Sequence, residues 1–229
     1  MLYGSHARGN ARPDSDIDIL QVVSGAPAAY SIGQVNVAQY RPGTLKIMAR
    51  AGSLFIFHLM KEGVILSDPL GVLAGCFDAY VSPENYEQML ADIQLASLAL
   101  DPDTRDLENL VGRCRLGIYL LRTTLYVQAV QRGIESFDIQ VLLEEAGDPD
   151  LDRVTQFRNL PENELGRGEM VALHAQLSKR LGASLVNSYE SLEALAVASA
   201  DNPRVLPLFE NILLGQRNVN YSALTLPPF

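Results

Sequence analysis

The strongest constraint on the fold is a change in hydrophobic periodicity near residue 80. Before it, short segments alternate apolar and polar side chains at every second position, as half-buried strands do. After Tyr80, apolar residues recur every three or four positions, which is the period of amphipathic helices. The pattern predicts an α+β protein, with a small mixed β-sheet domain in residues 1–80 and an all-helical domain in residues 81–229.

Turn residues divide the two segments into elements. In the first, they predict strands at residues 1–3, 15–23, 33–41 and 64–66. Residues 44–62 predict one helix, which Gly52 weakens because glycine has a low helix propensity. In the second segment we expect a helix that begins at Ser82-Pro83-Glu84, and others at 105–132, 137–146, 151–158, 169–199 and 203–214. The helix at 105–132 has apolar residues on more than one face, so we expect it to be central and mostly buried.

Charge is divided unevenly between the two segments. The chain carries a formal net charge of −9, and residues 1–80 hold six basic and six acidic side chains. The whole acidic excess therefore lies in residues 81–229. An acidic chain is a poor candidate for a non-specific nucleic-acid coat or for a basic protein that binds membrane surfaces.

Cysteine content and hydropathy indicate the compartment. Cys76 and Cys114 are too few for a disulfide scaffold, and their neighbours offer no metal-ligand spacing, so we expect two reduced, buried thiols. Met1 leads at once into a Gly-Ser turn and charged residues, which is not the pattern of a signal peptide. The longest apolar stretches are far shorter than the roughly 20 residues of a membrane span. We expect a cytoplasmic protein that does not act at a membrane.

Two aspartates at the start of the second predicted strand carry the clearest chemical signal. Residues i and i+2 of a strand project from one face, so Asp16 and Asp18 are expected to point together while Ile17 and Ile19 face the core. Two adjacent carboxylates repel each other unless a hard cation lies between them, and oxygen ligands of this kind suit magnesium. We therefore predict a metal site at Asp16 and Asp18.

A glycine-serine turn precedes the aspartates by about ten residues. Gly4 permits a close approach of the backbone, and Ser5 can offer its hydroxyl and its N–H to a phosphate oxygen. Arg8 can either order the loop that follows or contact phosphate. Gly4, Ser5 and Arg8 are therefore predicted to bind a phosphate group.

The combined motif resembles the signature of the DNA polymerase beta-like nucleotidyltransferase superfamily. It reads Gly4-Ser5-His6-Ala7-Arg8-Gly9 and then Ser15-Asp16-Ile17-Asp18-Ile19-Leu20, which is closest to the small bacterial members of minimal or aminoglycoside type. The clear resemblance covers residues 2–23, and a weaker match of element order continues to about residue 70. It implies a magnesium-dependent transfer of a nucleoside monophosphate from a nucleoside triphosphate such as ATP, with Asp16 and Asp18 as catalytic metal ligands.

Two departures from the family pattern bear on activity. Active members carry a third carboxylate on the next core strand, and here Asn36 stands at that position, with no Asp or Glu between Asp18 and Glu62. An amide cannot take a proton from an acceptor hydroxyl. Members also have a helix before the Gly-Ser strand, whereas this chain starts at that strand. Either the true start lies upstream, or the exposed sheet face is covered by the C-terminal helices or by another chain, in a homo-oligomer or with a partner.

Two functions remain open. The first is an active transferase acting on a hydroxyl of a small molecule or protein, its site completed by a carboxylate from elsewhere (Asp68, Glu84 or another subunit). The second is a catalytically weakened protein that acts as a binding, antitoxin-like or regulatory subunit. The substrate would lie in the cleft between the domains. The acidic helical segment favours a cationic acceptor, such as an aminoglycoside-like compound or a basic protein face, over nucleic acid.

Other polar residues are interpreted as structural. His58 lies in an apolar stretch, which is typical of a core or interface histidine bonded to the backbone. Arginines recur along the predicted helix at 105–132, where they either pair with acidic neighbours or bind a triphosphate or an acidic acceptor; they are Arg113, Arg115, Arg122 and Arg132.

Overall fold

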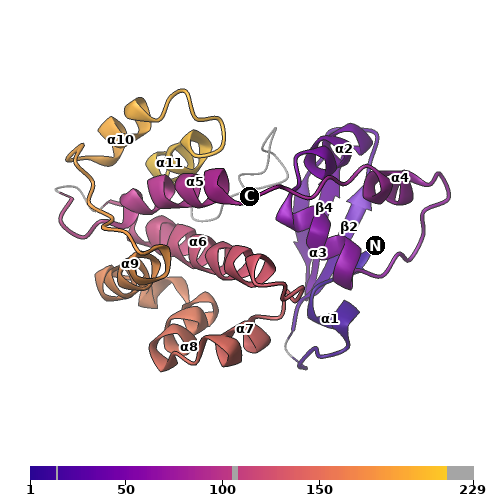
Figure 1. Cartoon of the computed structure of the whole chain (residues 1–229), viewed down its shortest axis with the longest axis horizontal. Coiled ribbons are helices and arrows are strands. Elements are labelled where there is room, and N and C mark those ends of the chain that lie inside the picture. The colour runs from indigo at the N-terminus through magenta and orange to yellow at the C-terminus, as the bar shows by residue number, and fades with distance from the viewer. Residues whose placement is uncertain (14, 105–107, 216–229) are drawn as a thin grey trace. The chain divides into compact units, whose positions relative to one another are not determined.

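The computed structural model describes residues 1–13, 15–104 and 108–215, and it confirms the α+β class (Figure 1). The chain forms two compact units. Among the described residues, the first contains Met1–Asn85 together with Arg132–Asp138, and the second contains Tyr86–Gln131 and residues 139–215. The predicted boundary at residue 80 did not anticipate that a later stretch of the chain belongs to the first unit.

A four-stranded mixed sheet forms the centre of the first unit. Its strands are β1 (Leu2–Tyr3), β2 (Ile17–Val22), β3 (Ala29–Ile32) and β4 (Val35–Tyr40). The order across the sheet is β1-β2-β4-β3, with β2 and β4 parallel and the two outer pairs antiparallel. The predicted strand at 64–66 is reduced to a single bridge between Val64 and Leu2.

Strand β3 was not predicted because all four of its residues are exposed and give no alternating pattern. It forms a hairpin with β4 around Gly33, whose φ of 60° lies in the left-handed region that glycine adopts without strain. This hairpin brings Ser31 beside Asn36. The predicted strand at 33–41 is therefore one arm of a hairpin.

Four helices accompany the sheet: α1 (Ser5–Arg8), α2 (Pro42–Arg50), α3 (Leu54–Glu62) and α4 (Val72–Asp78). The prediction of one helix over 44–62 is wrong, because the chain turns at Gly52 with φ 69°. A β-carbon there would lie 2.8 Å from the carbonyl oxygen of Val81, so the turn also requires a small residue. Ser53 then caps α3 by accepting from the backbone N–H of Phe55.

The core of the first unit lies between the sheet and helices α2, α3 and α4. Leu20 of β2 is 1% exposed and packs there, and Val22 adds to the same cluster. Because side chains alternate along a strand, Asp18 shares the face of Leu20, whereas Ile17 and Ile19 lie on the opposite face and are half-buried. The expectation that Ile17 and Ile19 face this core is therefore wrong.

The second unit is all-helical in the residues that the structure describes. Its α-helices are α5 (Glu87–Ser97), α6 (Leu110–Gln131), α7 (Ile139–Ala146), α8 (Pro149–Thr155), α9 (Arg167–Leu181), α10 (Leu192–Ala198) and α11 (Leu206–Leu213). Helix α6 has buried residues all around its circumference, as expected for a central helix. The predicted helix start at Ser82 is wrong, since α5 begins at Glu87, and the predicted helix at 169–199 is two helices.

Two arginines of α6 bond to backbone carbonyl groups elsewhere in this unit. Arg113 of α6 is 2% exposed and donates to the carbonyl oxygens of Ala99 and Glu108, and Arg115 donates to those of Arg158 and Leu160. These two arginines therefore hold backbone segments together.

None of the described helices combines the length and the apolar composition that crossing a bilayer requires.

Candidate active site

Gly4 and Asp18 approach each other closely at the end of strand β1. Tyr3 pairs with Asp18 across β1 and β2, which places the next residue, Gly4, beside the aspartate. A β-carbon on residue 4 would lie 2.6 Å from Oδ2 of Asp18, closer than such contacts occur. Gly4 also has φ 75°, in the left-handed region. Position 4 therefore requires glycine both for its backbone conformation and for the space that the carboxylate occupies.

Asn36 faces Asp18 from the neighbouring strand. The two residues are partners in the parallel register of β2 and β4, and Nδ2 of Asn36 donates to Oδ1 of Asp18 at 3.5 Å. On its other side, Oδ1 of Asn36 accepts from the hydroxyl of Ser31 at 2.7 Å. The hydroxyl thus orients the amide, so that its N–H groups and not its oxygen point toward the carboxylate. Asn36, the predicted third-position residue, therefore lies opposite Asp18 in the sheet.

Two of the predicted site residues lie at the ends of their elements. Asp16 is exposed and comes just before β2, and Ser5 is half-buried and opens α1 directly after Gly4. Burial, and then the charge of Asp18, raise the pKa of Tyr3, so its phenol stays protonated beside the site. In the structure, Gly4 and Asn36 therefore both lie next to Asp18. Ser5 follows Gly4 in the chain.

The donor set suits a hard cation with few protein ligands. Asp16 and Asp18 supply carboxylate oxygens, the ligand type that magnesium prefers, and magnesium commonly binds through one or two carboxylates plus substrate phosphates. Within the described parts of the chain, no group of three or more His, Cys, Asp or Glu residues is placed to hold a metal. Asp16 and Asp18 are the residues that would hold such a cation, together with the phosphates of a nucleotide.

The loop between α1 and β2 is organised by Ser15. Its hydroxyl accepts from the backbone N–H of Arg12 at 2.9 Å, and its N–H donates to the carbonyl of Arg12. Nε2 of His6 lies 3.2 Å from the carbonyl oxygen of Ser15. These bonds join α1 to the residue that precedes Asp16, so the two halves of the motif form one local structure.

Arg8 is bound by a carboxylate of the same unit. Its Nη1 donates to Oε2 of Glu62 at 2.8 Å, and Nε2 of His58 lies 3.2 Å from the same oxygen. Oε1 of Glu62 accepts from the backbone N–H of Phe137 at 2.8 Å. Burial alone would raise the pKa of Glu62, but the hydrogen bonds from His58, Phe137 and Arg8 lower it to about 2. In this structure the guanidinium of Arg8 is therefore paired with Glu62.

The sequence did not identify Glu62 or Ser31 as part of the site. The spacing of His58 and Glu62, four residues apart on one helix, is a signal for their pairing. Glu62 also contacts Arg8 and Phe137, which are 54 and 75 positions away in the chain. No local pattern in the sequence reveals such pairs.

Asp68 and Glu84 do not supply a third carboxylate next to Asp18. Asp68 accepts from three backbone N–H groups at the start of α4, those of Val72, Leu73 and Ala74, at 2.8–3.1 Å. Both of its oxygens therefore serve to cap that helix. Glu84 is exposed in the stretch before α5.

The N-terminal segment is similar to a known protein family. Residues 1–50 match the family described as nucleotidyltransferase domain, and the match runs from β1 to the end of α2. The comparisons with curated proteins and with solved structures gave no match.

Proposed function

Because residues 1–50 match the model of a nucleotidyltransferase domain, we propose that this protein transfers a nucleoside monophosphate from a nucleoside triphosphate to a hydroxyl group. The acceptor is a small molecule or a protein, and the reaction requires magnesium. The observation that carries the proposal is the packing of Asp18 against the bare α-carbon of Gly4. It joins a phosphate-binding turn and a metal-binding strand in one site.

Each residue of the site has a role in this reaction. The carboxylates of Asp16 and Asp18 bind the cation that accompanies the triphosphate, and the hydroxyl and N–H of Ser5 hold a phosphate oxygen. When bound, magnesium supplies positive charge to the phosphates and to the pyrophosphate that leaves. Asn36 positions Asp18 through its amide N–H. Arg8 keeps the loop after Ser5 in place through Glu62.

The charge distribution supports a cationic acceptor. The acidic excess of nine charges lies in residues 81–229, while residues 1–80 are neutral. A polyanionic acceptor would be repelled by the second segment, whereas a polyamine-like small molecule or a basic protein face would be attracted to it. We therefore favour acceptors of these two kinds over DNA or RNA.

A second candidate function is supported by the orientation of Asn36. Its N–H groups face Asp18, and its oxygen is engaged by Ser31, so the position offers neither a general base nor an anionic ligand. Loss of a positioned general base lowers a rate by about 10²–10⁴-fold. In this alternative the protein binds the magnesium nucleotide and acts through a partner as a regulatory subunit.

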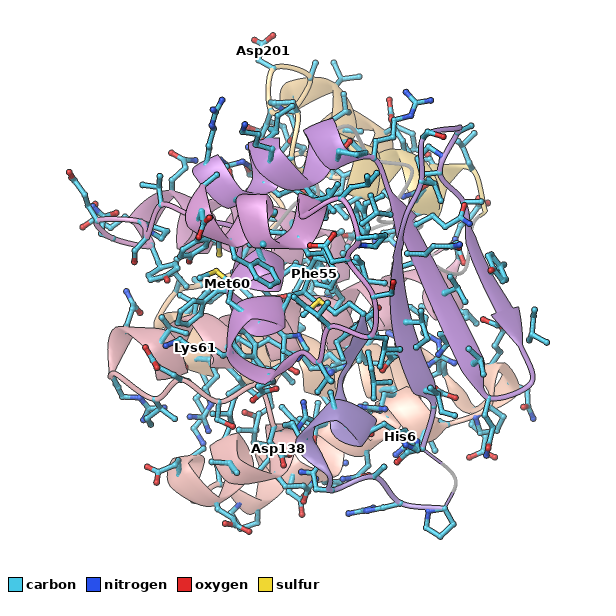
Figure 2. The ribbon with its side chains drawn as sticks, turned by 90° about the vertical axis from the view of Figure 1, so that its right-hand side faces the viewer. His6, Phe55, Met60, Lys61, Asp138 and Asp201 are labelled. Atoms are coloured by element: carbon cyan, nitrogen blue, oxygen red, sulfur yellow. The ribbon has the colours of Figure 1, made fainter. Side chains whose placement is uncertain are left out.

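An assay for transfer of label from the α-phosphate distinguishes the two candidate functions. It is run with each of the four nucleoside triphosphates. The acceptors are an aminoglycoside, a basic protein and the protein itself, each with and without Mg²⁺. The double variant Asp16→Ala, Asp18→Ala should abolish transfer, whereas Asp201→Ala, which removes an exposed carboxylate of the second unit (Figure 2), should not. Magnesium-dependent nucleotide binding without transfer favours the regulatory role. Absence of both binding and transfer contradicts both functions.

A further inference from the structure

The segment Arg132–Asp138, which we call the return segment, belongs to the first unit although both of its neighbours in the chain belong to the second. It packs on one face of α3. The Phe137 ring stacks on His58 with centroids 4.7 Å apart and meets the edge of Phe57 at 5.9 Å. Glu135 pairs with Lys61 at 2.5 Å. Phe137 is 4% exposed, so the return segment is anchored by a buried aromatic side chain.

Glu62 joins the return segment to residues 5–13, which we call the phosphate-binding loop. One carboxylate oxygen accepts from the backbone N–H of Phe137, and the other pairs with Arg8 and His58. The side chain of Glu62 is 10% exposed and that of Arg8 is 19% exposed, so solvent screens this pair much less than a surface pair. A single carboxylate thus holds both segments at once.

A second contact ties the same loop to the return segment. Nδ2 of Asn10 donates to Oδ2 of Asp138, and Figure 2 shows Asp138 beside helix α1. Arg8 and Asn10 flank Gly9, which turns the chain with φ 78°. Contacts on both sides of a glycine turn remove conformational freedom from the part of the chain that is otherwise most free.

We propose that Glu62 is a positioning residue for the phosphate-binding loop, and that the loop holds its binding geometry only while the return segment is docked on α3. The part of this proposal that concerns phosphate rests on the proposed function. Undocking of Phe137 removes the partner of one Glu62 oxygen and frees Asn10 from Asp138. The order of the loop is therefore coupled to the return segment, which connects the end of α6 to the start of α7.

The opposite role for Glu62 is sequestration of Arg8 from the phosphates. The two roles predict opposite changes in nucleotide affinity for the variant Glu62→Gln. Glutamine at position 62 keeps an oxygen for the N–H of Phe137 but turns an NH₂ group toward Arg8, so it breaks the tie on the loop side and leaves the return segment docked. Positioning predicts weaker nucleotide binding in Glu62→Gln, and sequestration predicts tighter binding.

The test measures loop order and nucleotide binding on the full-length chain. Amide hydrogen exchange is followed in residues 5–13, and affinity is measured with Mn²⁺ and a fluorescent, non-hydrolysable ATP analogue. Glu62→Gln should speed exchange in the loop and weaken binding, each by about tenfold, the effect of losing one charge-assisted hydrogen bond. The matched control Glu135→Gln breaks the neighbouring pair with Lys61 and should change both by less than about twofold.

A second variant covers the case in which Glu62→Gln fails to fold. Asn10 is exposed, so Asn10→Ala should fold normally and still speed exchange in the loop. Unchanged loop exchange in both variants, or tighter nucleotide binding in Glu62→Gln, overturns the proposal. Absence of nucleotide binding by the wild-type chain instead contradicts the proposed function, and hydrogen exchange alone then decides whether Glu62 orders the loop.

Discussion

The carboxylate of Asp18 occupies the space that a side chain on Gly4 would need. A β-carbon at position 4 would lie 2.6 Å from Oδ2, and the residue has φ 75°. The glycine and the aspartate of the motif, fourteen positions apart, are therefore one structural unit, made adjacent by the pairing of Tyr3 with Asp18. Ser5 follows Gly4 directly and opens α1.

Gly4→Ala should therefore abolish nucleotide binding as well as lower stability. We expect the left-handed backbone to cost about 1–3 kcal/mol of the free energy of unfolding, and the displaced Asp18 to lose its cation. Gly182→Ala is the matched control, because Gly182 lies outside the motif and has φ 62°, and a β-carbon on it would meet nothing within 4 Å. Urea denaturation and titration with Mn²⁺ and a nucleotide analogue check the pair. Equal loss of binding in the two variants would contradict a specific role of the Gly4–Asp18 contact.

Asn36→Asp should raise the affinity of the site for divalent cations. A carboxylate at this position faces Asp18 in register, and Ser31 still donates to it. We expect Mn²⁺ in the presence of nucleotide to bind at least about tenfold more tightly, since affinity rises with ligand charge. Without the cation, repulsion between the two carboxylates should lower the melting temperature.

The control for Asn36→Asp is Gln39→Glu, which adds the same charge to β4 on the opposite face of the sheet. It should leave cation affinity within about twofold of wild type, because the added charge does not face Asp18. Isothermal titration calorimetry measures both variants. Comparable effects of the two substitutions would show that net charge, and not the geometry at Asn36, determines binding.

The sequence predicted the two strands that carry the candidate site better than the packing around them. The position of Asn36 was predicted from the resemblance to the family pattern, and the parallel register of β2 and β4 puts this residue opposite Asp18. The core face of β2 was predicted wrongly because Ile17 and Ile19 are as apolar as Leu20 and Val22, and periodicity alone cannot show which face the helices cover. The contacts of Glu62 with Arg8 and Phe137 depend on tertiary folding and have no sequence signal.

The stability of the fold should depend on the ionisation of Glu62 in acid. Its pKa is about 2 in the folded protein against an ordinary value of 4.5. A lowered carboxyl pKa contributes stability that is fully present above the unfolded value of 4.5 and is lost as the pH falls toward 2. The charges that face it are those of Arg8 from α1 and, when protonated, His58 from α3, with the Lys61–Glu135 pair nearby.

Between about pH 5 and pH 2.5 we therefore expect the free energy of unfolding to fall more steeply in the wild-type chain than in Glu62→Gln. The full contribution of the group is about 3 kcal/mol, by conversion of the pKa difference. Urea denaturation over this range measures the slopes. In Glu135→Gln, which breaks a more exposed ion pair, the fall in the free energy of unfolding over this pH range should stay within about 0.5 kcal/mol of the wild-type fall. Parallel curves for the wild type and Glu62→Gln would contradict the role assigned to this carboxylate.

Asp68→Ala should separate helix capping from cation binding. Asp68 accepts from the N–H groups of Val72, Leu73 and Ala74, and removing it leaves these donors at the start of α4 without the carboxylate. We expect a loss of about 0.5–2 kcal/mol in the free energy of unfolding and no change in Mn²⁺ affinity. Asp68→Asn retains one acceptor oxygen and should recover part of the stability. If Asp68→Ala instead weakened Mn²⁺ binding as much as Asp16→Ala does, Asp68 would have to leave its helix cap and complete the site when the nucleotide binds.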